Sequence, residues 1–216
     1  MTKAVAGGGQ SRNDGPRTPP DPNPTLIAGV DEVGRGALFG PVVAAAVILS
    51  ESAAMELQTL GVTDSKCLSP QRRGQLIKPI KALSIACAIG YASVQEIDRI
   101  NILQASLLAM HRAVSRLSPT PILCRVDGNQ KIPQLGIPQQ TVIKGDQTDT
   151  AIAAASILAK VWRDQLIIRL DRRYPGYGLA QHKGYGSAAH RQAIQTLGLT
   201  RQHRQSFRGC QLPLEL

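Results

Sequence analysis

Short apolar runs, bounded by charged or turn residues, alternate along this chain with longer stretches of helical periodicity. The apolar runs at residues 26–30, 42–49 and 84–92 each predict a buried strand, and those at 122–126 and 140–144 predict two more. The first three strands can be joined without long helices, which favours antiparallel neighbours.

The helical stretches carry apolar residues at spacings of three and four. Helices are expected from about residue 97 to 117, 149 to 170 and 187 to 197. A further helix is expected to begin at Pro70, with Ser69 as its N-cap. The order of these elements predicts an α/β fold, with a mixed five-stranded sheet flanked by helices and a C-terminal helical segment.

Four acidic residues stand at or just after the ends of predicted strands: Asp31, Glu32, Asp127 and Asp146. Strand ends converge on one edge of an open α/β sheet, so these carboxylates are expected to gather there. Their repulsion requires a cation or raised pKa values, and hard oxygen ligands suit Mg²⁺ or Mn²⁺ better than zinc. Asp31 and Glu32 serve one site only if the strand ends there, because successive strand residues point to opposite faces. The alternative for each acid is a turn or cap role, which is strongest for Asp127 in an Asp-Gly-Asn sequence.

The glycine-rich stretch 34–40, GRGALFG, comes near the dinucleotide-binding fingerprint but departs from it. It follows two carboxylates, which repel a pyrophosphate, and it leads into a β-branched run instead of a helix. We therefore expect no nucleotide cofactor here. The glycines instead indicate backbone that a large ligand approaches closely.

The net charge of the chain indicates the class of molecule that it binds. The 216 residues carry a net charge of +10. From Lys160 to Arg208 there are ten Lys and Arg against Asp164 and Asp171 alone, a net charge of +8. A basic surface of this kind favours nucleic acid as the partner. An acid-rich edge beside it suggests metal-assisted phosphodiester chemistry.

Cysteine usage and hydropathy indicate a reducing, cytoplasmic setting. The four cysteines contain no Cys-x-x-Cys pair, which disfavours zinc and a disulfide scaffold. No apolar run approaches the roughly 18 residues of a membrane span. Residues 1–24 are rich in Gly, Pro and polar residues, and we expect a disordered tail there.

The motifs from about Leu26 to Phe207 occur in the order of a known family. They are AGVDEVGRG, TDSK, NILQASLLAMHRAV, VDGN, KGD, AAASILAKVWRD and YGLAQHKGYG. With them the chain resembles bacterial ribonuclease HII, the type 2 ribonuclease H family. The resemblance implies a ribonuclease H-like catalytic domain over 25–210 and a short tail at 211–216.

The resemblance also implies an activity. It is that of an endoribonuclease, dependent on Mn²⁺ or Mg²⁺, which cleaves the RNA strand of RNA–DNA hybrids. Such an enzyme also incises 5′ of single ribonucleotides in duplex DNA, leaving 3′-hydroxyl and 5′-phosphate ends, in DNA replication and repair. We expect a monomer, because no apolar stripe is left over once the helices cover the sheet.

Residue roles follow from the same resemblance. The family's catalytic, metal-binding acids fall on the positions of Asp31, Glu32, Asp127 and Asp146. Its reader of the ribonucleotide 2′-hydroxyl falls on Gly34, Arg35 and Gly36, and the tyrosine that packs on the next deoxyribose falls on Tyr185. Lys66 and Lys183 are candidates for phosphate contacts, with a solvated charge as the alternative. Two positions depart from the family pattern: Ala37 replaces a proline, and Cys67 replaces a second lysine.

Other polar and aromatic residues receive plainer interpretations. Asp164 is expected to be helical and paired with nearby arginines, and Trp162 to lie in a helix core. The histidines His182, His190 and His203 lack metal-ligand spacing and stay unassigned. Two other functions stay open: a non-catalytic nucleic-acid-binding module, which the basic final quarter would support, and a nuclease of the same fold acting on DNA. The acid set disfavours the first, and the 2′-hydroxyl reader disfavours the second.

Overall fold

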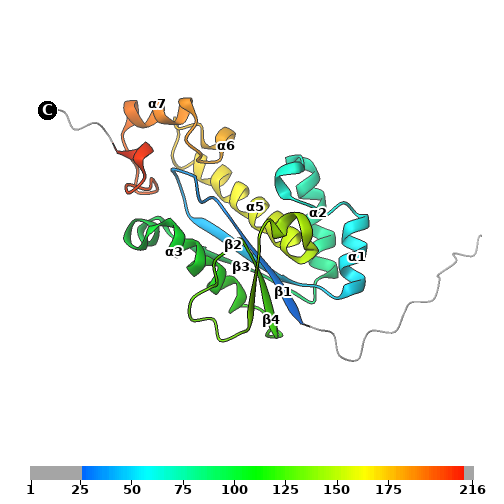
Figure 1. Cartoon of the computed structure of the whole chain (residues 1–216). Coiled ribbons are helices and arrows are strands. Elements are labelled where there is room, and N and C mark those ends of the chain that lie inside the picture. Colours follow the sequence, from blue (N-terminus) through cyan, green and yellow to red (C-terminus); the bar gives the residue numbers. More distant parts are fainter. Residues whose placement is uncertain (1–25, 212–216) are drawn as a thin grey trace, which may run out of the picture.

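A mixed five-stranded sheet runs through the centre of the molecule (Figure 1). This computed structural model describes residues 26–211, so the expected tails lie outside the described part except for Gln211. The strand order is β3-β2-β1-β4-β5, with β1–β2 and β2–β3 antiparallel and β1–β4 and β4–β5 parallel. The mixed sheet and the three antiparallel neighbours are thus confirmed. The strands are β1 (Ile27–Val33), β2 (Val42–Ile48), β3 (Ala86–Ala92), β4 (Leu123–Asp127) and β5 (Gln139–Val142).

Helices cover both faces of this sheet (Figure 1). One face packs against α3, and the other packs against α5 together with α1 and α2. Two short 3-10 turns and three further helices complete the described part of the chain, residues 26–211. The helical elements are α1 (Glu51–Thr59), η1 (Ser65–Cys67), α2 (Pro70–Leu83), α3 (Val94–Val114), α4 (Gly145–Thr148), α5 (Thr150–Asp171), α6 (Leu179–His182), α7 (Ala188–Leu197) and η2 (Arg208–Cys210).

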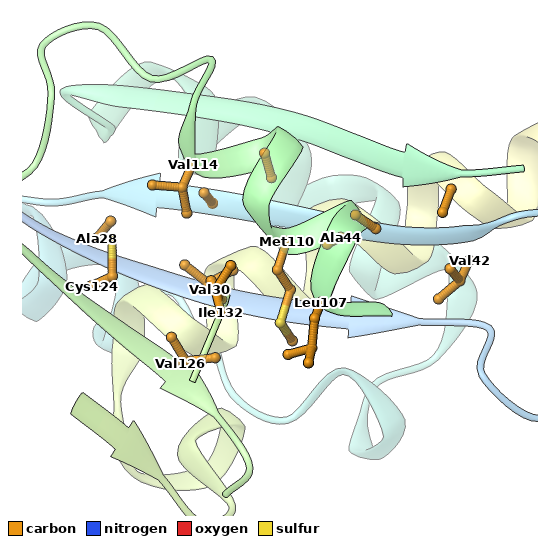
Figure 2. Close-up of a cluster of buried hydrophobic side chains, with 14 of the residues drawn as sticks. Ala28, Val30, Val42, Ala44, Leu107, Met110, Val114, Cys124, Val126 and Ile132 are labelled. Carbon is orange, nitrogen blue, oxygen red and sulfur yellow. The ribbon is translucent and has the colours of Figure 1, made fainter. Parts of the chain in front are cut away.

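Small side chains bring the helices close to the sheet. Figure 2 shows the core between α3 and the sheet, where Leu107, Met110 and Val114 of the helix meet alanines and valines of β1, β2 and β4. A methyl group at Gly29 of β1 would lie 2.3 Å from the backbone of α5. One at Gly90 of β3 would lie 2.1 Å from the backbone of α3. Backbone-to-backbone packing on both faces therefore fixes where α3 and α5 cross the sheet.

The sequence-based boundaries need several corrections. Strand β1 continues beyond residue 30 to Val33, because residues 28–33 remain paired with β2. The helices α1 and α2 both lie between β2 and β3, so a helical connection does join two of the antiparallel neighbours. Helix α1 was not expected, although Ser50 caps it through a bond from the Ala53 N–H.

The long helix α3 also differs from the expectation. It begins at Val94, where Ser93 and Glu96 form a reciprocal capping box. Asn101 interrupts it with φ of 65°, and its side chain accepts the Leu103 and Gln104 N–H groups to restart the helix. The helix ends at Val114, three residues before the expected end at about residue 117.

A smaller lobe with its own core is built from residues 37–40 and the C-terminal segment. The cluster comprises Leu38, Phe39, Ile167, Tyr177, Leu179, Ile194 and Cys210. Isolated bridges tie Ala37 to Tyr185 and Phe39 to His203, so this lobe is fastened to the loop that follows β1. None of the helices within residues 26–211 has the length and apolarity that a membrane crossing requires.

Candidate active site

The sheet opens between β1 and β4 at the point where the acidic residues stand. The parallel ladder between these strands ends at the pair Val30 and Val126. Asp31 and Asp127 are the next residues along each strand. Glu32 follows on β1, which still pairs with β2 there, so the strand does not end at the two acids as the sequence analysis required. Asp31 and Glu32 nevertheless line one pocket, and Asp146 lies on α4, which follows β5. Asp127 lies close enough to Asp31 and to Glu32 to raise the pKa of each.

Each carboxylate is held by a different partner. Asp31 Oδ1 accepts the Glu32 N–H at 2.7 Å, and Asp127 Oδ1 accepts the Gly145 N–H at 2.7 Å. Glu32 pairs with the Arg35 guanidinium at 3.3 Å. Asp146 pairs with the Lys66 ammonium at 3.5 Å. Backbone N–H groups therefore fix the two central acids, whereas the two outer acids depend on side-chain cations.

Burial makes this group of acids costly to ionise. The pKa of Asp31 lies well above its usual value, chiefly because the side chain is buried and secondly because Glu32 is adjacent. Burial also raises the pKa of Glu32, against the opposing effect of Arg35. The pKa of Asp146 is raised by burial and by Asp64 and Asp127. Such raised pKa values are typical of a group of acids that binds a cation.

The donor set suits a hard divalent cation. All four side chains offer carboxylate oxygens, which Mg²⁺ and Mn²⁺ prefer. Within residues 26–211, no three His, Cys, Asp or Glu side chains converge closely enough to hold a metal as they stand. Two of the four acids are instead paired with cations of the protein: Glu32 with Arg35, and Asp146 with Lys66. Both cations are exposed, so a metal ion could replace them as partners with small rearrangements.

A small pocket adjoins Asp31 and Glu32. Lys160, Ser156 and Ser65 also line it, and sequence analysis had missed all three as site residues. Ser156 and Lys160 are four residues apart on α5, so one helix face presents both to the acids. Ser65 and Ser156 hydroxyls lie 2.9 Å apart, and Ser156 lowers the pKa of Asp31 against the larger effect of burial. The signal available in the sequence was the four-residue spacing of Ser156 and Lys160. This spacing indicates a site only once the direction of α5 relative to the acids is known.

The glycine-arginine-glycine loop is held from inside the protein. Gly34 has φ of 91°, and a side chain there would meet Arg163 at 2.2 Å. The buried Arg163 guanidinium donates to the carbonyls of Phe39, Pro41 and Lys183. Nothing lies within 4 Å of the place where a Cβ at Gly36 would stand. Gly34 thus has a structural reason to be glycine, whereas the open space at Gly36 suits close approach of a ligand.

The remaining predicted residues fall in different places. The Tyr185 ring lines the acid pocket, with the Lys160 ammonium 5.7 Å from its centre. Lys66 also lines the pocket. Lys183 does not, because its ammonium bonds to the Ala180 carbonyl.

Two further expectations need revision. Asp164 is helical, as expected, but its partner is Lys160 at 2.9 Å and not an arginine. Trp162 is only half-buried, at the edge of the core, where its ring stacks on Tyr91 with centroids 6.1 Å apart.

Comparisons with known proteins agree with this architecture. The family model described as Ribonuclease HII matches residues 28–210. Ribonuclease HII of Acaryochloris marina is 68% identical over 188 residues, which cover 87% of this chain and 95% of that protein. Ribonuclease HII of Microcystis aeruginosa is 62% identical over 88% of this chain and 91% of its own length.

Solved structures share the fold. Ribonuclease H2 of Pyrococcus horikoshii has a TM-score of 0.72 at 26% identity, over 85% of this chain and 94% of that one. Ribonuclease HII of Archaeoglobus fulgidus, solved in complex with PCNA, has a TM-score of 0.71 at 27% identity, over 88% of this chain and 98% of that one. Bst-RNase HIII, solved in complex with Mn²⁺, has a TM-score of 0.64 at 19% identity, over 87% and 68% of the two chains, which shows the fold alone.

Proposed function

This chain belongs to the ribonuclease HII family, and on that premise we propose that Asp31, Glu32, Asp127 and Asp146 form its catalytic centre. The chain is a hydrolase, an endoribonuclease that cleaves the RNA strand of RNA–DNA hybrids. Incision 5′ of a ribonucleotide, with dependence on a metal ion, is the function of this family. The single observation that carries the site assignment is the opening of the β1–β4 ladder at Val30, which places Asp31 beside Asp127.

The four acids would hold divalent metal ions, and we propose Mn²⁺ or Mg²⁺. Bound there, such ions activate a water molecule and stabilise the leaving oxygen of the phosphodiester. The protein's part is to fix the ligands. Backbone N–H groups hold Asp31 and Asp127.

Recognition of the ribonucleotide would fall to the loop after β1. Gly36 leaves open space at the surface, so backbone there can approach a 2′-hydroxyl, the group that distinguishes RNA from DNA. Tyr185, which lines the pocket beside Asp31 and Glu32, would pack on the following deoxyribose. Lys66 and Lys160 would contact phosphates, since both cations line the pocket. Lys183 stays a weaker candidate because its ammonium already has a partner.

The proposed substrates are RNA–DNA hybrids and duplex DNA that contains single ribonucleotides. We propose that the protein acts on them as a monomer in the cytoplasm. A non-catalytic binding module is disfavoured by the site itself. Carboxylates that ionise there repel a phosphate unless a cation is present, so a module that only binds nucleic acid gains nothing from them.

The test is cleavage of an end-labelled DNA duplex with one embedded ribonucleotide, with Mg²⁺, Mn²⁺ or EDTA, beside an all-DNA duplex. We expect one metal-dependent nick 5′ of the ribonucleotide and none in the all-DNA control. Asp127→Asn should lose cleavage but keep binding, because asparagine retains an oxygen for the Gly145 N–H. Full activity in that variant would overturn the assignment, and equal cleavage of all-DNA would indicate a different nuclease.

A further inference from the structure

Three histidines lie together against the loop of residues 183–187, here called the tyrosine loop because it carries Tyr185. The proposed reaction uses none of these histidines. His182 and His190 stack with ring centroids 4.4 Å apart, and His190 and His203 lie 5.3 Å apart. His190 and His203 are almost completely buried, with exposed fractions of 0% and 1%. Burial of polar groups this complete requires every nitrogen to find a partner.

The partners determine the protonation state of His203. Its Nδ1 lies 2.9 Å from the Thr200 N–H, which can only donate, so Nδ1 carries a lone pair. The proton of the neutral ring therefore sits on Nε2. That nitrogen lies 3.2 Å from His190 Nε2 and donates to it.

The same reasoning fixes His190. Its Nε2 accepts from His203, and its Nδ1 lies 3.0 Å from the Tyr185 carbonyl oxygen, which can only accept. The proton of His190 therefore sits on Nδ1, and the two rings are opposite tautomers. Burial lowers the pKa of His190 and lowers that of His203 to about 4, so both are neutral at pH 7. A chain of donors runs from Thr200 through both rings to the Tyr185 carbonyl.

His182 is fixed independently. Its Nδ1 accepts the Gly184 N–H at 3.2 Å, and its Nε2 donates to the Tyr177 carbonyl at 2.9 Å. Every ring nitrogen in the cluster is therefore engaged within the protein. No lone pair is left over for a metal ion, which leaves a positioning role as the interpretation.

Three consecutive carbonyls of the tyrosine loop are each held by a different group. Arg163 donates to the carbonyl of Lys183 at 2.9 Å. The Leu38 and Phe39 N–H groups donate to that of Gly184 at 2.8 and 3.2 Å. His190 donates to that of Tyr185. The first two bonds tie the loop to α5 and to the segment after β1. The Tyr185 carbonyl also accepts the Ser187 N–H at 2.9 Å within the loop, and among the described residues His190 supplies the one side-chain hydrogen bond to Tyr185, whose ring faces the acids.

We propose that His190 and His203 are positioning residues, which orient the Tyr185 ring against the substrate through this fixed chain of imidazole hydrogen bonds. This inference rests on the proposed function, because it requires Tyr185 to pack on a sugar. It assigns the histidines no contact with the substrate. Their effect should therefore appear in substrate affinity and disappear when the Tyr185 ring is removed.

Two substitutions at position 190 distinguish the loss of the hydrogen bond from the loss of the ring. His190→Asn keeps an N–H near the place of Nδ1, whereas His190→Phe keeps the ring and loses the donor. We expect His190→Phe to raise KM for the single-ribonucleotide duplex roughly three- to thirtyfold, which lies within the range of coupling between contacting groups, with a smaller change in kcat. His190→Asn should recover part of that loss. Melting temperatures of all variants show whether each is folded.

A double-mutant cycle tests the route through the tyrosine. In the Tyr185→Ala background, His190→Phe should change KM less than twofold. Equal effects in both backgrounds would overturn the inference, as would a loss in His190→Asn equal to that in His190→Phe. The wild-type nicking assay is run beside the cycle. If the wild type does not nick, the proposed function fails; if it nicks and the cycle is additive, only this inference fails.

Nitrogen-15 spectra of the wild-type imidazoles provide a test that needs no variant. The protein has only four histidines, so the signals are few. We expect the Nδ1–H form at His190 and the Nε2–H form at His203 at pH 7. Two rings of the same tautomer, or a charged ring in the pair, would contradict the proposed chain.

Discussion

At the scale of single residues, function and stability conflict at Asp31. This carboxylate is buried beside another acid, so its pKa is raised and its ionised form is unfavourable in the metal-free protein. We expect Asp31→Asn to abolish cleavage and also to raise the thermal midpoint measured in EDTA, by roughly 2–4 °C for each 1 kcal/mol gained. The gain should shrink as the pH falls through the folded pKa toward the unfolded value, because wild-type Asp31 is then protonated as well.

Asp164→Asn is the matched control for that measurement. Asp164 is a half-buried acid near the site, and unlike Asp31 it is paired with a lysine, Lys160, at 2.9 Å. Its neutralisation removes an ion pair instead of a repulsion, so no rise in the midpoint is expected. A lower midpoint for Asp31→Asn than for the wild type would mean that the acid stabilises the fold.

The sequence was informative about residues whose role depends on position along the chain. Asp31, Glu32 and Asp127 could be singled out because acids at strand ends are unusual and strand ends meet at one edge. Lys160 could not be singled out, since a lysine within a helix is ordinary until the helix is placed against the acids. The roles of all these residues stay predictions until cleavage is measured.

At the scale of elements, glycines set the distance between helix and sheet. An alanine at Gly90 of β3 would place its methyl 2.1 Å from the Ala109 carbonyl oxygen and 2.5 Å from the Ala113 nitrogen. Backbone atoms of α3 cannot move aside without shifting the helix. We therefore expect Gly90→Ala to destabilise the protein by about 1–3 kcal/mol or more, as overpacked cores do, measured by urea unfolding.

Gly74→Ala is the counterpart on α2. Nothing lies within 4 Å of a methyl group there, and the position is exposed inside a helix. This substitution should stabilise the protein by roughly 0.5–1 kcal/mol, because alanine restricts the unfolded chain and favours the helix. Equal stability of the two variants would show that α3 does not pack on β3 at this distance.

Element types followed from the pattern more reliably than element ends. Apolar runs and capping residues such as Ser69 depend on nearby residues, and the elements they predicted are present. The continuation of β1 to Val33 depends on β2, whose backbone pairs with both acids. The break in α3 depends on the side chain of Asn101, which accepts two N–H groups in a left-handed conformation. A partner distant in the sequence therefore decides the first of these features, and the conformation of one residue decides the second; the periodicity of apolar residues indicates neither.

At the scale of the whole molecule, the smaller lobe and the sheet meet at the site. The sheet supplies the acids, and the lobe supplies Tyr185 through the bridge to Ala37. Two buried arginines join them: Arg163 bonds to the carbonyls of 39, 41 and 183, and Arg204 bonds to those of Arg35 and Gly40. Part of the positive charge of the segment from Lys160 to Arg208 is thus buried inside the protein. The net charge of +8 therefore overstates the cationic surface available to nucleic acid.

Salt dependence measures how much of that surface is used. Without divalent metal, the logarithm of the binding constant for an RNA–DNA hybrid should fall linearly with the logarithm of salt concentration, by about 0.9 in slope for each phosphate neutralised. Lys66→Gln should reduce the slope by roughly 1, because this ammonium is exposed beside the acids. Lys81→Gln, near the end of α2 and at the opposite end of the sheet, should leave it unchanged. Equal slopes for Lys66→Gln and the wild type would remove Lys66 from the phosphate contacts and leave Lys160 as the cation at the pocket.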